Sequence, residues 1–315
     1  MRIAWQLVAL GLMFAAAPAP ARDLYVNNLA GEDRYTGAQA TPYSDGTGPV
    51  RTIAKALRLA QAGDRIVLAK TDQPYRESIT LCGNRHSGYA QQAFTIQGNG
   101  AVLDGSLPVP PRAWEHYRDD VFRFQPPGQG TQQLYLDGRP AVRAPYDSLR
   151  GGLPRLEVGQ WCLADGRIYF RVEKDKLPES YDLSFARLVT GVTLYHVEHV
   201  AIVGLTIQGF QNDGLNAFNS ARRVYLAEVM CRGNGRSGLT VGGASQVEID
   251  VCMSGNNGEA QLLTLPYSHT QLRNSRLLGN TAPGWVDQGG RVLLGDKPIE
   301  GGRAEVNGDQ EPPSP

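Results

Sequence analysis

Four similar stretches follow one another between residues 200 and 291: VAIVGLTIQGFQNDGLNAFNSARR (200–223), VYLAEVMCRGNGRSGLTVGGASQ (224–246), VEIDVCMSGNNGEAQLLTLPYSH (247–269) and TQLRNSRLLGNTAPGWVDQGGR (270–291). When their first residues are aligned, apolar side chains form columns that repeat about every 23 to 24 residues. Two of these columns are Ile202, Leu226, Ile249, Leu272 and Leu215, Leu239, Leu262, Trp285. Alternate residues of a strand point to one side, and one repeat cannot bury that side alone. The sequence therefore predicts a solenoid of stacked short strands.

The period also fits a leucine-rich repeat, but the residues argue against it. The consensus L-x-x-L-x-L-x-x-N is absent, and no helix-forming stretch lies between the predicted strands. A turn recurs instead, because Asn234, Asn257 and Asn280 stand at equal spacing. Asn tolerates left-handed backbone conformations and bonds to nearby backbone, so these side chains are expected to stack as a hydrogen-bonded ladder at one corner.

With these columns and turns the chain resembles the right-handed parallel β-helix proteins of the pectin lyase-like superfamily. The resemblance implies an all-β fold built as a right-handed parallel β-helix. Residues 52–62 are predicted to form a helix with Ile53, Leu57 and Ala60 on one face and Gly63 as its stop signal. The strand, helix and strand around it resemble the N-terminal cap of secreted β-helix proteins.

The predicted boundaries divide the chain into an N-terminal cap with the first coils (22–106), an insertion (107–185), further coils (186–298) and a tail (299–315). The repeat vanishes in the insertion, where Asp137-Gly138 and Asp165-Gly166 separate strand-like runs. Asp-Gly between such runs predicts a β-hairpin, so the insertion is expected to be β-rich. The tail is rich in Gly, Pro, Glu and Asp and is predicted to be disordered.

The first 21 residues have the pattern of a secretory signal peptide, with Arg2, an apolar run and Ala19-Pro20-Ala21. The protein is therefore expected to be secreted or periplasmic. No other stretch is long and apolar enough to predict a membrane span. Lys+Arg and Asp+Glu balance at 31 each, which gives no electrostatic case for nucleic acid binding.

The four cysteines invite a disulfide interpretation in an exported chain. Cys231 and Cys252 fall in apolar columns and are expected to be small buried core residues. Whether Cys82 and Cys162 pair stays open, since they would have to meet across distant segments.

Proteins of the superfamily most often handle polysaccharides, so the resemblance implies a polysaccharide partner. Asn212-Asp213-Gly214-Leu215-Asn216 is similar to part of the polygalacturonase motif Asn-Thr-Asp-Gly-x-Asp, which makes Asp213 a candidate catalytic carboxylate. Hydrolysis needs a second carboxylate nearby, but the motif's second one is Asn216 here, and the following coil carries Arg236. The alternative is that Asp213-Gly214 only forms a turn.

A lyase needs a base, and Arg236 is the outward candidate on the next coil. Asp213 and Glu259 flank it as candidate calcium or substrate contacts, so calcium is a candidate cofactor without a recognisable ligand cluster. Substrate contacts are predicted at Asn212, Asn216, Glu259 and Arg276, and no metal ligands are assigned. The alternative for Arg236 and Glu259 is an ordinary exposed ion pair. His196 and His199 share a face only if the chain bends between them.

Two functions stay open at this stage. The first is a secreted β-helix protein that binds or processes polysaccharide by lyase or hydrolase chemistry, with an incomplete catalytic set. The second is a non-enzymatic extracellular surface or matrix protein that uses the solenoid as a binding platform. Weak predicted cover over the last coil also suggests self-association through the C-terminal end.

Overall fold

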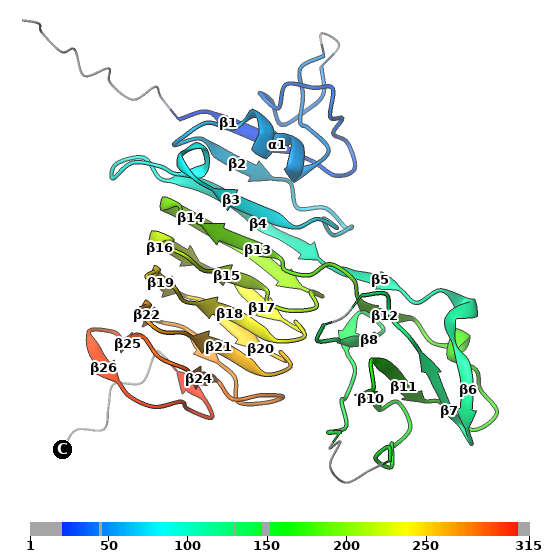
Figure 1. Cartoon of the computed structure of the whole chain (residues 1–315). Helices are drawn as coiled ribbons and strands as arrows, with labels where there is room; N and C mark the ends of the chain where they lie inside the picture. The colour runs from blue at the N-terminus through cyan, green and yellow to red at the C-terminus, as the bar shows by residue number, and fades with distance from the viewer. Residues whose placement is uncertain (1–20, 44–45, 129, 147–151, 308–315) are drawn as a thin grey trace, which may run out of the picture.

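The computed structural model describes residues 21–43, 46–128, 130–146 and 152–307, which form an almost entirely β protein with its strands stacked along one axis (Figure 1). The all-β prediction is confirmed. The predicted signal peptide, apart from Ala21, lies outside the described residues. Within these ranges the only α-helix is α1 (Ile53–Leu59), and no helix is both long and apolar enough to cross a membrane.

The larger sheet has thirteen strands and bends along its length. Its first leg contains β1 (Asp23–Val26), β2 (Arg65–Leu68), β4 (Phe94–Asp104), β14 (Glu198–Gln208), β16 (Arg222–Ala227), β19 (Gln246–Asp250), β22 (His269–Arg273), β25 (Arg291–Leu294) and β26 (Lys297–Ile299). Strands β4 and β14 continue into a second leg with β17 (Met230–Arg232), β20 (Met253–Gly255), β23 (Arg276–Leu277) and β27 (Val306–Asn307). All pairings are parallel except those of β26 and β27.

The second sheet of the stack has six parallel strands: β3 (Ile79–Cys82), β13 (Val192–Tyr195), β15 (Leu215–Ala217), β18 (Ser237–Val241), β21 (Ala260–Thr264) and β24 (Trp285–Asp287). The predicted apolar columns are in register, since Leu215 pairs with Leu239, and Leu239 with Leu262. These side chains are buried in one core that also holds Cys231 and Cys252. All four cysteines are free thiols, so no disulfide joins Cys82 to Cys162.

The predicted asparagine ladder is present for two of its three residues. Asn257 Oδ1 accepts hydrogen bonds from Asn234 N at 2.9 Å and Asn234 Nδ2 at 3.0 Å, and both residues are fully buried. Asn280 is exposed and bonds instead to Asn256, with its Nδ2 2.9 Å from Asn256 Oδ1. The ladder therefore ends at Asn257, where the chain enters the last coil.

Helix α1 covers the first coil, with Ile53, Ala56 and Leu57 buried against the core. Thr52 is its N-cap and accepts a hydrogen bond from Lys55 N at 3.1 Å. The helix ends at Leu59, three residues earlier than predicted. Ala60 is already extended, with ψ 150°, and the carboxylate of Asp64 accepts from Gln61 N at 2.8 Å, which turns the chain toward β2.

The last coil is covered by the chain itself, contrary to the prediction that the tail is disordered from residue 299. β26 pairs antiparallel with β25, and β27 pairs antiparallel with β23. Val306 is buried in the core, and Arg303 bridges to Trp285. Apolar side chains at Ile299 and Val306 pack against the exposed end of the core, which a composition rich in polar residues obscured. Residues 308–315 lie outside the described ranges.

Residues 106–186 form two antiparallel four-stranded sheets beside the stack (Figure 1). Their strands are β5 (Ser106–Pro108), β6 (Glu115–Arg118), β7 (Val121–Phe124), β8 (Leu134–Leu136), β9 (Arg139–Pro140), β10 (Trp161–Ala164), β11 (Arg167–Arg171) and β12 (Leu183–Ala186). The predicted Asp-Gly turns join β8 to β9 and β10 to β11, with positive φ at both residues of each turn. This insertion is anchored to the coils by Tyr135, whose hydroxyl donates to the Gly233 carbonyl.

Candidate functional site

Asp213 and Arg236, the residues predicted to be catalytic, form a hydrogen-bonded ion pair. Arg236 Nε donates to Asp213 Oδ1 at 2.8 Å, and its Nη2 donates to Oδ2. Ser237 Oγ and Asn216 Nδ2 donate to the same carboxylate at 2.9 and 2.7 Å. The hydrogen bond to Asp213 raises the pKa of Arg236. Asp213 is 0% exposed and has four donors, so its carboxylate cannot contact a substrate in this conformation.

Of the other predicted substrate contacts, Asn212 and Glu259 lie next to this pair on successive coils, since Arg236 N donates to the Asn212 carbonyl at 2.9 Å and Glu259 N donates to the Arg236 carbonyl at 2.7 Å. Asn212 Oδ1 accepts a hydrogen bond from Thr131 Oγ1 of the insertion at 3.2 Å. Glu259 is exposed on the next coil, and the ion pair of Arg236 is with Asp213 rather than with Glu259. Arg276 lies in β23 of the other sheet. The structure thus brings together Asn212, Asp213, Asn216, Arg236 and Glu259 but not Arg276, and hydrogen bonds from Asn216 and the half-buried Arg236 enclose the buried carboxylate of Asp213.

A groove of about 460 Å³ lies instead on the outer face of the larger sheet, over β16, β19, β22 and β25. Its size is within the range of small-molecule sites. Inward residues such as Val224, Val247 and Val292 belong to the core, so the residues next to them point outward. The outward side chains that line the groove include Arg223, Tyr225, Gln246, Glu248, Gln271 and Leu293.

One row of the groove is formed by residues paired directly across neighbouring strands. Tyr225 pairs with Glu248, Glu248 with Gln271, and Gln271 with Leu293. Parallel strands are about 4.8 Å apart, so this row places an aromatic ring, a carboxylate, an amide and an apolar side chain at regular steps. Such a row offers hydrogen-bond donors and acceptors beside apolar surface, as a sugar chain requires.

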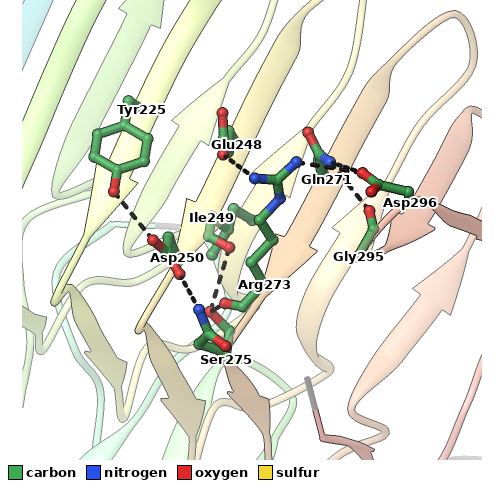
Figure 2. Close-up of polar contacts among 10 residues, drawn as sticks. Tyr225, Glu248, Ile249, Asp250, Gln271, Arg273, Ser275, Gly295 and Asp296 are labelled. Carbon is green, nitrogen blue, oxygen red and sulfur yellow. Dashed lines mark hydrogen bonds and ion pairs between the residues drawn. The ribbon is translucent and has the colours of Figure 1, made fainter. Parts of the chain in front are cut away.

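A polar network holds the carboxylates of β19 (Figure 2). Tyr225 Oη donates to Asp250 Oδ2 at 3.1 Å, and Asn274 Nδ2 donates to Asp250 Oδ1 at 2.9 Å. Burial, helped by the hydrogen bond to Asp250 and by the charges of Asp250 and Glu248, raises the pKa of Tyr225. Its phenol therefore stays protonated and remains a donor to Asp250.

Arg273 and Gln271 extend the network toward the end of the stack (Figure 2). Arg273 Nη1 lies 3.7 Å from Glu248 Oε1, and its Nη2 donates to Asp296 Oδ1 at 3.3 Å. Gln271 Nε2 donates to the Gly295 carbonyl at 3.0 Å. These contacts orient the side chains that line the groove before any ligand is bound.

Glu248 and Asp250 are two residues apart in β19 and point to the same outer face. Two residues of a strand span about 7 Å, so two carboxyl groups stand side by side on an accessible surface. Inverting glycosidases place their two carboxyl groups about 6.5 to 9.5 Å apart, which leaves room for a water molecule. Among the described residues no three His, Cys, Asp or Glu side chains are grouped to hold a metal ion.

Tyr225, Glu248 and Gln271 are not among the site residues that the sequence predicted. A signal for them exists, because each directly follows an inward residue of the first column (Val224, Val247 or Thr270) and they recur at the repeat period. The resemblance to the polygalacturonase motif pointed to the turn at residues 212–216 instead. Only the structure shows that Asp213 is buried and that the open groove lies over β16, β19, β22 and β25.

No family model matches the chain, and no curated protein matches it. Among solved structures it is similar to one titled "Glycoside hydrolase", with a TM-score of 0.57 and 13% identity over 81% of this chain and 73% of that one. It is also similar to XylC in complex with xylose, with a TM-score of 0.55 and 14% identity over 80% of this chain. The match covers 53% of the XylC chain, so this chain spans about half the length of XylC.

Pectate lyase Pel9A is matched at a TM-score of only 0.34 and 11% identity, over 82% of this chain and 63% of that one, a likeness too weak to carry an argument. At these identities, the similarity to the first two structures shows a shared fold alone. The chain is thus an all-β protein of stacked parallel strands, a fold that it shares with a glycoside hydrolase.

Proposed function

We propose that this protein is a secreted or periplasmic right-handed parallel β-helix protein of the pectin lyase-like superfamily that binds a polysaccharide and hydrolyses it in the groove over β16, β19, β22 and β25. The fold assignment is supported by the parallel pairing of successive coils, the capping helix and the buried Asn234 and Asn257. Export is supported by the signal-peptide pattern of the first 21 residues.

One observation carries the activity: Tyr225 and Glu248 line the groove, and a second carboxylate, Asp250, lies at its border, hydrogen-bonded to Tyr225. In the proposed reaction Asp250, oriented by Tyr225 and Asn274, takes a proton from water. The water oxygen attacks the anomeric carbon while the glycosidic C–O bond breaks, and Glu248, which first takes up a proton from solvent, passes that proton to the leaving oxygen. Hydrolysis is preferred to elimination because Arg236, the base predicted for a lyase, is occupied by Asp213.

The test is a screen of the purified protein against neutral and acidic polysaccharides, with and without calcium, that records both reducing ends and unsaturated products. We expect new reducing ends and no unsaturated products. Glu248→Gln and Asp250→Asn should each lower the rate at least about a hundredfold while binding is kept. Glu157→Gln, which removes an exposed carboxylate of the insertion outside the groove, is the matched control and should leave the rate unchanged. Unsaturated products would overturn the assignment of hydrolysis.

A non-enzymatic extracellular binding protein is the second candidate, and one observation favours it. Both carboxylates already have partners, Arg273 at Glu248 and Tyr225 at Asp250, as expected for side chains that only shape a binding surface. Binding of a polysaccharide without any product across the screen would establish this function. Self-association through the C-terminal end is not needed to cover the last coil, because β26 and β27 already cover it.

A further inference from the structure

A second cleft, larger than the groove, lies at the same edge of the stack. Its volume is about 850 Å³, and it is bounded by residues 84–91 and by the beginnings of β14 and β16. In Figure 1 the cyan segment between β3 and β4 lies next to the start of β14, at the edge where the strands of the groove also begin. The polar residues that matter below are His196, Glu198, His199 and Arg222, and the aromatic one is Tyr89.

The backbone bends so that two histidines face this cleft. His196 and His199 are three residues apart, a spacing that puts side chains on opposite sides of a regular strand. Both have left-handed backbone conformations, with φ of 51° and 54°. The two bends bring both imidazoles to the lining of the cleft. The same conformation recurs at matching corners of later coils, as at Ser220, Arg223 and Ala244, so the bend belongs to the coil and carries the two histidines to the cleft.

A single ion pair separates the cleft from the groove. Glu198 lines the cleft, Arg223 lines the groove, and Arg223 Nη1 donates to Glu198 Oε1. Arg222, the neighbour of Arg223, faces the cleft. Both members of the ion pair are about half exposed, with side-chain exposures of 59% and 47%. An exposed pair of this kind contributes little stability, so a ligand can displace it at small cost.

We infer that the cleft and the groove are two parts of one extended binding site, and that its ligand is a linear oligosaccharide long enough to cross the Glu198–Arg223 pair. This inference rests on the proposed function of the groove and specifies the form of its ligand. From β25 to β14 the site crosses four strand spacings, or about 19 Å, and the cleft continues beyond β14. A single sugar cannot occupy both parts.

The chemistry of the cleft suits a polyol. A sugar hydroxyl both donates and accepts hydrogen bonds, and the cleft offers a carboxylate at Glu198, a guanidinium at Arg222 and imidazoles that can do either. Tyr89 presents a ring that is 46% exposed, a surface on which a sugar ring can pack. A metal site fits less well, since among the described residues these histidines and Glu198 do not form a ligand group.

The experiment measures the affinity of one polysaccharide's oligomers, from the disaccharide to the octasaccharide, by calorimetry. The polysaccharide is the one found in the screen above, and catalysis is blocked by Glu248→Gln in every protein used. Affinity should rise with length beyond the oligomers that fill the groove. Tyr89→Ala and His199→Asn, which keeps a residue tolerant of positive φ, should each weaken binding of the octasaccharide about tenfold and leave the disaccharide unaffected. Tyr267→Ala, at an exposed tyrosine outside both sites, is the control.

Four results bear on the inference. Equal affinity for short and long oligomers, or full octasaccharide binding by the Tyr89 and His199 variants, would overturn the extended site and leave the groove as the binding site. A loss that is equal for all lengths would also overturn it, because the variants would then act through the fold. Failure of every oligomer to bind would overturn the proposed function itself.

Discussion

Arg236 and Asp213 form a hydrogen-bonded ion pair between two successive coils, and the carboxylate is completely buried. Their positions on neighbouring coils suggest catalysis when only the sequence is considered. The structure shows that Ser237 and Asn216 complete the shell of donors around Asp213. The pair therefore acts on stability, because each partner compensates for the cost of removing the other from water.

We expect Asp213→Asn to lower the free energy of unfolding by about 3 kcal/mol, since it leaves the half-buried Arg236 without its counter-charge. Chemical denaturation measures this change. Glu259→Gln removes an exposed carboxylate on the next coil and should change stability by less than about 0.5 kcal/mol. If Asp213→Asn instead abolished turnover with stability intact, the catalytic role predicted from the sequence would be restored.

The asparagine ladder provides a second stability test. Asn257→Ala removes the acceptor of two hydrogen bonds from Asn234 and leaves a buried backbone N–H unpaired, so unfolding should become easier by about 2 kcal/mol or more. Asn280→Ala is the matched control at the next coil, where the side chain is exposed, and should be close to neutral. Equal effects of the two substitutions would show that the burial of Asn257 does not matter.

The core of this fold could be predicted from the sequence because it depends on periodic burial. Ile202, Leu226 and Ile249 recur at the repeat period, and the structure pairs them in register. Such columns can be recognised from the repeat period alone, without knowing which distant segments are in contact. The same pattern identified Cys231 and Cys252 as buried residues.

The site was not predictable in the same way, because exposure at the turns depends on partners from other segments. Asp213 is buried beneath Arg236 and Ser237, which reach it from the next coil. Asn212 is held by Thr131 of the insertion, which is distant in sequence. His199 faces a cleft only because its backbone takes a positive φ, which no spacing rule indicates.

Attachment of the insertion can be tested at Tyr135, which is fully enclosed and donates to the Gly233 carbonyl. Tyr135→Phe leaves that carbonyl without its partner and should reduce the free energy of unfolding by about 1 to 2 kcal/mol. Hydrogen exchange should show faster opening of β8 and β9. Tyr117→Phe, at a more exposed tyrosine of the same insertion, should alter neither quantity.

The pH dependence of stability should include a contribution from His86. Burial lowers the pKa of His86, while its Nε2 contact with the Leu57 carbonyl at 3.1 Å opposes that shift, and Nδ1 faces Cys82 N at 3.2 Å. The folded state thus binds its proton less readily than the unfolded chain, so stability rises with pH. The contribution is complete above the unfolded pKa of about 6.5 and is lost as the pH falls through the folded value.

Two measurements check this expectation. Proton NMR should show the His86 imidazole titrating below about pH 6.5. The loss of stability on acidification should be smaller in His86→Gln than in the native protein, whereas His116→Gln, at an exposed histidine, should retain the native profile. A His86 titration at or above the ordinary histidine value would contradict the assignment.

Substitutions of Tyr225 can distinguish ligand binding from hydrolysis, because its ring lines the groove and its hydroxyl orients Asp250. Tyr225→Phe keeps the ring and loses the hydrogen bond, so affinity should be kept while the rate of hydrolysis falls about tenfold. Tyr225→Ala also removes the ring and should weaken binding about tenfold, or about 1.4 kcal/mol. Tyr267→Ala, at a tyrosine 81% exposed outside the groove, should change neither. A rate unchanged in Tyr225→Phe would mean that Asp250 does not need this donor, and unchanged binding in Tyr225→Ala would place the ligand elsewhere.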